Sequence, residues 1–215
     1  MRPLLLILLT LGFLAPAAAD IVKPALVEIS VFSEGRYRIE VRASIEALLT
    51  GINGRYRNTT EAPNADEYDA LRVLSAADLA EAFRPFHARL LDEIELRLDG
   101  ERATLRLASV DIPVPGYTKV PRISLIVLSG QAERDKHQLT WYYPMKFGDH
   151  ATRVRQVDEE NERWHWSDHQ WIKQDVYTEP YALDQIFARQ PFYKIMKTYA
   201  VSGFQHIVPL GLDHI

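Results

Sequence analysis

The sequence predicts a mainly β protein, a two-sheet β-sandwich with one inserted helix and further helices near its C-terminus. Three observations support this class. Apolar and polar residues alternate with a period of two through much of the chain after residue 20, turn signals separate the alternating runs, and one long segment has helical spacing. An immunoglobulin-like outline is one form that such a sandwich takes, and the pattern leaves the strand order open.

The composition favours one folded domain with appendages. The chain has 215 residues, of which 47% are hydrophobic and 25% charged, so it can bury a core of ordinary size. Its formal net charge of -4 gives no basic footprint of the kind that nucleic acid requires, and we expect no nucleic-acid partner. Cysteine is absent, which excludes disulfides, thiolate metal sites and cysteine nucleophiles.

Residues 1–19 are typical of a secretory signal peptide. Arg2 supplies a positive charge, residues 4–14 form an apolar run, and Ala17 and Ala19 are the small residues that the peptidase requires. We expect cleavage after Ala19 and export of the remainder of the chain. The alternative is an uncleaved anchor, although a spanning helix needs about 20 apolar residues.

Two hairpins are predicted early in the exported part. Residues 25–32 and 36–42 alternate on either side of a turn at residues 33–35, and their polar face is charged, as a solvated face usually is. The second hairpin turns at Asp99-Gly100, the strongest short signal for a type I′ turn. Its strands are expected to hold Ile94, Leu96 and Leu98 before the turn and Leu105 and Leu107 after it. Further strands are expected at residues 123–129, 139–143, 152–157 and 170–176.

The clearest helical pattern covers residues 76–91. Ser75 is its candidate N-cap, and Pro85 is expected to kink the helix or to split it in two. A shorter helix is expected to begin at Ile45 and to lead into a loop that ends near Asn64.

A cluster of aromatic and histidine residues occupies the segment 164–171. The alternation of Trp164 and Trp166 favours a strand, on which His165 and His169 lie about 13 Å apart, too far for one metal ion. The alternative is a helical turn, on which the two histidines and a neighbouring carboxylate could share a metal. The charged residues before this cluster, 158–163, are expected to form a solvated loop. We find no catalytic motif and expect no enzymatic activity.

The C-terminal segment 203–215 places ionisable groups among apolar residues. His206, Asp213 and His214 suit nickel, zinc or a proton relay, and ionisable groups at membrane depth usually mark an ion path. With Gly211, they resemble the start of the first membrane helix in the HupE/UreJ family of hydrogenase and urease accessory membrane proteins. The closest likeness is to the branch with a large N-terminal extracytoplasmic domain. Six residues separate His206 from Asp213, one more than in the nickel-permease branch.

This resemblance implies the extracytoplasmic domain of a membrane protein that takes up nickel or another divalent metal ion. The implied metal ligands are His206, Asp213 and His214. Beyond a transported metal ion, we expect no cofactor. The alternative is a free periplasmic β-sandwich that binds a ligand or acts as an adaptor without transport.

The same resemblance gives an expected domain organisation. A signal peptide (1–19) precedes an extracytoplasmic sandwich (20–180). A helical juxtamembrane segment (181–215) then ends at the start of the membrane region. Within it, residues 182–187 and 192–201 are expected to be helical, the second either at the membrane interface or packed on the sandwich. The protein is then exported and lies at the cell membrane, with its domain facing the periplasm or the cell exterior.

Overall fold

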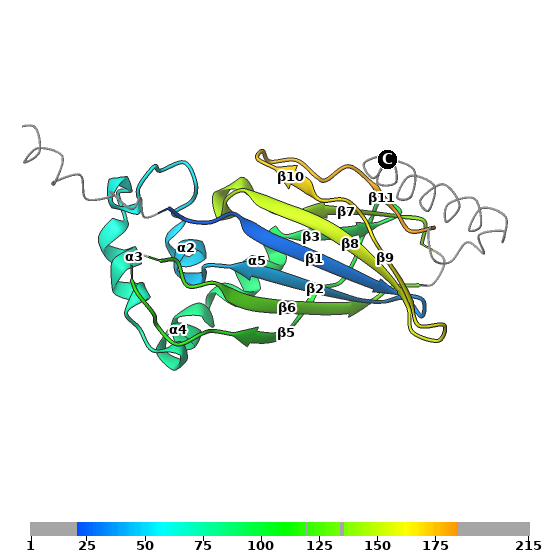
Figure 1. The fold of residues 1–215 in the computed structure, drawn as a ribbon, viewed down its shortest axis with the longest axis horizontal. Helices are drawn as coiled ribbons and strands as arrows, with labels where there is room; N and C mark the ends of the chain where they lie inside the picture. Colours follow the sequence, from blue (N-terminus) through cyan, green and yellow to red (C-terminus); the bar gives the residue numbers. More distant parts are fainter. Residues whose placement is uncertain (1–20, 119, 134–135, 185–215) are drawn as a thin grey trace, which may run out of the picture.

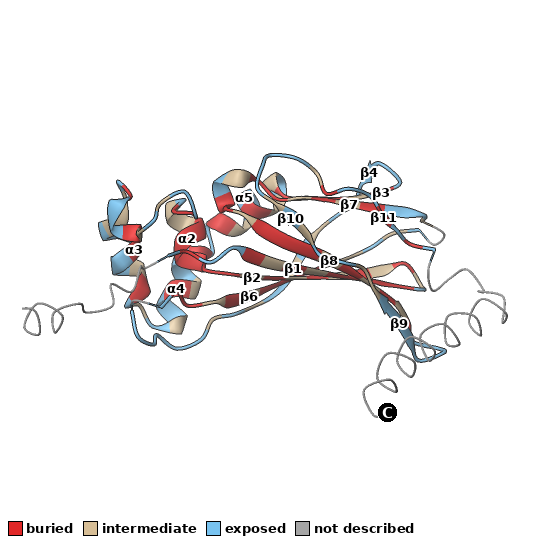
Figure 2. Ribbon diagram, turned by 45° about the horizontal axis from the view of Figure 1, so that its top comes forward, coloured by how far each residue is buried: buried red, intermediate tan, exposed pale blue. Residues whose placement is uncertain are grey.

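Two β-sheets pack face to face in a computed structural model of the chain, which describes residues 21–118, 120–133 and 136–184. One sheet has seven strands and the other has four, so the predicted two-sheet sandwich is confirmed. Figure 1 looks onto the larger sheet, and several helices gather beyond one end of its strands. In Figure 2 the smaller sheet lies above the larger one, and buried residues line the facing sides.

The larger sheet has the strand order β10-β8-β1-β2-β6-β5, and β9 also pairs with β8. β1 and β8 are parallel, and every other neighbouring pair is antiparallel. The sheets of an immunoglobulin domain are antiparallel, so this central parallel pair is a difference in topology. The strands are β1 (Ala25–Phe32), β2 (Arg36–Ala43), β5 (Arg106–Asp111), β6 (Ser124–Gln131), β8 (His150–Asp158), β9 (Arg163–Trp166) and β10 (Gln170–Ile172).

The smaller sheet has the order β11-β7-β3-β4, and it corrects one predicted hairpin. Asp99 and Gly100 both have positive φ, as the predicted turn requires, but the returning strand has only two residues. The following residues cross to the larger sheet, because β6 offers them a longer antiparallel partner. The strands are β3 (Glu95–Leu98), β4 (Glu101–Arg102), β7 (Gln138–Tyr142) and β11 (Tyr181–Ala182).

Within the described residues, the helices lie in the chain between β2 and β3, apart from one short turn after β7. Ser75 caps the predicted long helix by accepting a hydrogen bond from the Asp78 amide at 3.1 Å, and Pro85 splits this helix in two as expected. The helix α3 was not predicted, because charged residues make up half of it and Tyr68 is the one apolar side chain that it buries. The helices are α2 (Ile45–Thr50), the 3₁₀ turn η1 (Thr59–Glu61), α3 (Ala65–Arg72), α4 (Ala76–Phe83), α5 (Phe86–Glu93) and the 3₁₀ turn η2 (Met145–Phe147).

One expectation about the later part of the chain is corrected, and another is confirmed except at its first residue. The helix expected at residues 182–187 does not begin there, because Ala182 belongs to β11 and pairs with Gln138 of β7. The charged stretch 158–163 forms the tight turn between β8 and β9, and its residues 159–163 are exposed, as expected of a solvated loop, whereas Asp158 ends β8. The Asp158 carboxylate is buried there, and it accepts hydrogen bonds from Asn161 and Arg163.

One buried ion pair ties the helices to the larger sheet. The Arg122 side chain, just before β6, donates from Nε to the Glu46 carboxylate of α2 at 2.8 Å. The same guanidinium donates to the carbonyls of Leu71, Leu74 and Pro113 at 3.0–3.3 Å. A single side chain therefore holds α2, the end of α3 and the segment between β5 and β6.

The larger sheet also has a close contact in which glycine is required. The Tyr37 hydroxyl of β2 donates to the Thr104 carbonyl at 2.5 Å, passing over Gly130 of β6. A Cβ at residue 130 would collide with both groups. Replacing Gly130 by alanine should therefore lower the free energy of unfolding by roughly 1–3 kcal/mol through overpacking. Urea denaturation checks this, with Gly54→Ala as a control because no atom lies near a Cβ there.

Candidate functional site

The predicted metal ligands His206, Asp213 and His214 lie outside the described residues. The alternative metal site at His165 and His169 is not assembled. Trp164–Trp166 lies on β9, as the strand prediction required, whereas His169 follows the strand. No group of three or more His, Asp or Glu side chains within residues 21–184, where described, could hold a metal ion.

The outward face of the larger sheet carries the most distinctive arrangement of charge. On β2 and β8, alternate residues are buried against the smaller sheet, and the intervening ones face out. The strand register places the outward residues of neighbouring strands side by side. We call this surface the arginine face, after the outward-facing Arg36, Arg38, Arg42, Arg106, Arg153 and Arg155.

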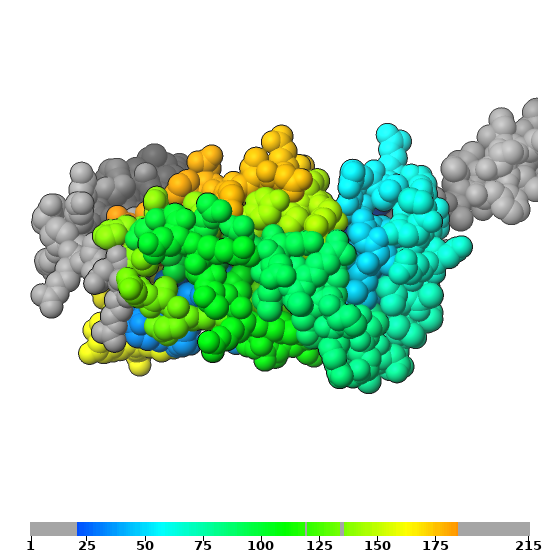
Figure 3. Space-filling view, turned by 180° about the vertical axis from the view of Figure 1, so that it is seen from behind, coloured from blue at the N-terminus to red at the C-terminus, as the bar shows by residue number. Residues whose placement is uncertain are grey.

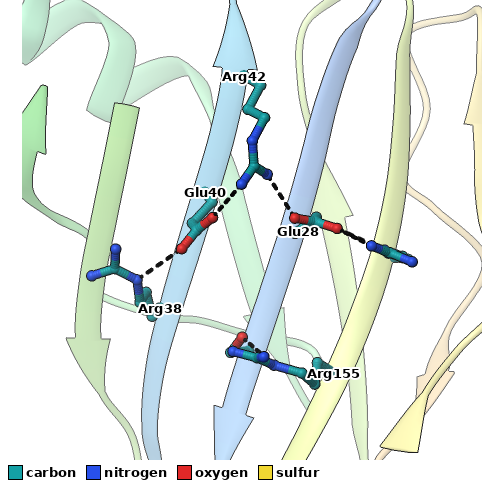
Figure 4. A network of polar contacts seen from close by, with 7 residues as sticks. Glu28, Arg38, Glu40, Arg42 and Arg155 are labelled. Carbon is teal, nitrogen blue, oxygen red and sulfur yellow. Dashed lines mark hydrogen bonds and ion pairs between the residues drawn. The ribbon is translucent and has the colours of Figure 1, made fainter. Parts of the chain in front are cut away.

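Two glutamates on this face are fully engaged by arginines. Glu28 of β1 accepts hydrogen bonds from Arg42 at 2.6 Å and from Arg153 at 2.8 Å. Glu40 of β2 accepts from Arg42 at 2.9 Å and from Arg38 at 3.1 Å. Figure 4 shows Arg42 lying between the two carboxylates. The arginines therefore outnumber the acids, and the network retains positive charge.

The charge on Glu28 is secured by its partners. Partial burial alone would raise the pKa of this carboxyl, but the hydrogen bonds and charges of Arg153 and Arg42 outweigh burial and lower the pKa. Glu28 therefore remains an anion at neutral pH and orients both arginines.

One cross-strand line of this face contains no acidic residue. Ser30 of β1 pairs with Arg155 of β8 on one side and with Arg38 of β2 on the other. Arg38 pairs in turn with Ser129 of β6, which pairs with Arg106 of β5. We call these five residues the arginine row. Arg155 donates from Nε to the Ser30 hydroxyl at 3.1 Å, and no carboxylate of the described residues forms an ion pair with Arg155 or Arg106.

Tryptophans line the same face along the outer side of β8. Trp164, Trp166 and Trp171 pair with the outward residues Val157, Arg155 and Ala151. We call these three residues the tryptophan edge. The guanidiniums of Arg153 and Arg155 lie 4.0 and 5.1 Å from the Trp166 ring centre, and Trp164 and Trp171 remain 66% and 64% exposed.

A hollow of about 440 Å³ lies away from the arginine face, between α5 and residues 102–105 at the end of β4. Figure 3 shows the side of the molecule on which the smaller sheet lies. Arg102 lines this hollow, but its guanidinium already donates to the Asp92 carbonyl at 2.8 Å at the end of α5. The arginine face therefore offers the stronger case for recognition.

The sequence alone reveals that the arginines of β2 share one face, but it does not reveal that they form a row with arginines of other strands. The alternation in residues 36–42 reveals one charged face, which is the usual solvated surface. Arg155 joins that face only because β8 pairs in parallel with β1, far away in sequence. No local pattern reports such a pairing.

No protein-family model matches this chain, and no curated protein matches it in sequence. Within the described part of the chain, no helix combines the length and the apolar character needed to cross a membrane.

Proposed function

We propose that this protein is an exported recognition domain, which acts by binding rather than by catalysis and contacts its partner through the arginine face. The arginine row is the observation that carries the proposal. Arginine presents a planar set of donors that suits carboxylate and phosphate groups, and such a row favours an anionic partner.

The proposal places this domain at the front of a HupE/UreJ-like membrane protein that handles nickel or another divalent metal. The support for this part is the signal-like N-terminus and the resemblance of residues 203–215 to the start of a membrane helix. The arginine face would equally serve a free periplasmic adaptor. The two forms differ in whether the gene encodes apolar segments of about 20 residues after Ile215.

Recognition is tested with bacterial cell-envelope material. The exported chain should bind this material, and binding should weaken as ionic strength rises, because salt screens charge pairs. Changing Arg38, Arg106 and Arg155 together to glutamine should abolish binding. Arg97→Gln, on the smaller sheet, is the control. Binding by the triple variant that equals wild-type binding would refute the proposal.

The metal role is tested separately by calorimetric titration of the purified chain with nickel. Replacing His206 or His214 by alanine should weaken nickel binding at least about tenfold, because an imidazole ligand is lost. His165→Ala should bind nickel as the wild type does. If the His206 and His214 variants both retain full affinity, the proposed ligand set is wrong.

A further inference from the structure

The arginine row provides regularly spaced positive charge. Neighbouring strands lie about 4.8 Å apart, so Arg155, Arg38 and Arg106 follow one another at steps of about 10 Å. Ser30 and Ser129 lie between them, and Ser30 is only 5% exposed because the Arg155 side chain lies over it and donates to its hydroxyl. The row is therefore a line of positive charge across the sheet rather than a pocket for one small ion.

Acidic residues flank the row on both sides, and arginines bind them there. The next outward line toward the helices contains Glu28 and Glu40, which accept hydrogen bonds from Arg42. In the opposite direction, Arg36 lies over the Phe32 ring and pairs with Glu34 and Glu159. Because the row itself contains no acidic residue and ends at Trp166, an anionic chain fits best along the row.

The tryptophan edge adds flat apolar surface at the β8 end of the row. Trp166 pairs directly with Arg155, and Trp164 lies one outward position further along, about 7 Å away. Large aromatic rings are seldom this exposed on a protein surface, and tryptophan combines an apolar ring with a polar N–H. The C–H faces of sugar rings fit this surface.

We propose that the arginine row and the tryptophan edge together bind an anionic glycan, a chain of sugar rings that bears carboxylate or phosphate groups. The anionic groups pair with Arg155, Arg38 and Arg106, and a sugar ring packs on Trp164. This inference rests on the proposed recognition function and names its ligand class. The exposed rings favour a glycan over an acidic peptide, which needs only the arginines.

The test measures binding of the exported chain to an oligogalacturonate, a neutral glucose oligosaccharide of similar length, inorganic polyphosphate and poly-L-glutamate. Titration calorimetry and tryptophan fluorescence report the affinity. We expect the oligogalacturonate to bind, with an affinity that falls as salt is added, and the neutral sugar not to bind. Tighter binding of polyphosphate than of oligogalacturonate would show that the arginine face binds anions without contacting sugar rings. That result would overturn the glycan assignment.

Matched variants separate the row from general surface charge. Arg38→Gln should weaken oligogalacturonate binding at least about tenfold, because a charge-assisted hydrogen bond is lost. Arg97→Gln should leave the affinity unchanged. The two arginines are alike, since Arg38 is 43% exposed and pairs with Glu40, while Arg97 is 40% exposed and pairs with Glu95.

The tryptophan variants decide between a glycan and a peptide. Trp164→Leu should weaken oligogalacturonate binding severalfold, and Tyr117→Leu, at an exposed ring outside this face, should not. Urea denaturation should show that each variant folds as the wild type does. If poly-L-glutamate binds through Arg38 and oligogalacturonate does not, the glycan assignment fails and the recognition function stands. If the binding of these probes and of envelope material does not depend on the arginine row, both the glycan assignment and the recognition function fail.

Discussion

Replacing Arg122 by alanine is expected to lower the free energy of unfolding by about 3–5 kcal/mol. The side chains of Arg122 and Glu46 are 6% and 0% exposed. Without the guanidinium, the buried Glu46 carboxylate keeps the Ser44 hydroxyl as a donor at 2.9 Å. A buried charge that loses its partner is not compensated by water, and the backbone carbonyls that Arg122 holds also lose a donor.

Urea denaturation of the protein measures this loss. The matched control is Arg84→Ala, which breaks the ion pair between Arg84 and Glu81. This pair lies at the surface, since the Arg84 and Glu81 side chains are 70% and 64% exposed. We expect the control to change the unfolding free energy by no more than about 0.5 kcal/mol. A double variant, Glu46→Leu with Arg122→Met, should be less destabilised than Arg122→Ala, because it removes both charges. Equal effects of Arg122→Ala and Arg84→Ala would show that the buried pair is not stabilising.

The second large effect is a loss of stability in mild acid, which we assign to His150. This residue lies on the inward face of β8, where its ring is 5.0 Å from that of Tyr143. Burial lowers the pKa of His150 from 6.5 to about 4, because the imidazolium cannot be solvated there. The folded protein therefore holds this imidazole neutral at pH values where the unfolded chain takes up a proton.

The sign of the pH dependence follows from that difference. The stabilisation is complete above pH 6.5 and is lost as the pH falls toward 4, by roughly 3 kcal/mol in total. Glu28, Asp99 and Asp158 have lowered pKa values, so their contribution is lost only below the usual carboxyl range. His87, whose pKa burial also lowers, adds in the same direction as His150.

Urea midpoints measured between pH 4 and 8 test this assignment. His150→Leu should flatten the curve between pH 4.5 and 6.5, which is the window that separates histidine from carboxyl titration. His165→Ala, at an exposed ring, should leave the curve unchanged. A wild-type midpoint that does not change across this window would contradict the assignment.

Local patterns in the sequence predicted much of the fold. Alternation fixed the strands at residues 25–43, and Pro85 split a helix where predicted, because both effects act within a few residues. The prediction for the strand after Asp99-Gly100 was wrong, since Arg106 and Leu107 pair with β6 rather than with β3. The turn was predicted correctly, but the choice between two sheets depends on residues far away in sequence.

The candidate site was predictable only in its parts. Arg38 and the tryptophans of residues 164–171 are evident in the sequence, and their side-chain chemistry is fixed. The sequence does not reveal their arrangement, because Arg155 reaches Ser30 through the pairing of β8 with β1, and these two residues are 125 positions apart in the chain. A shift of one residue in the β1–β8 register would move Arg155 to the buried face and remove the row.

The sequence by itself determined that the chain is mainly β, that its β2 strand has a charged face, and which side chains are available for binding. Only the tertiary structure decided that β8 lies parallel to β1, which aligns three arginines with two serines and places tryptophans at their end. The physical reason is that periodicity records which face of a strand is buried, whereas the neighbour of a strand is selected by packing and hydrogen bonding across the whole core.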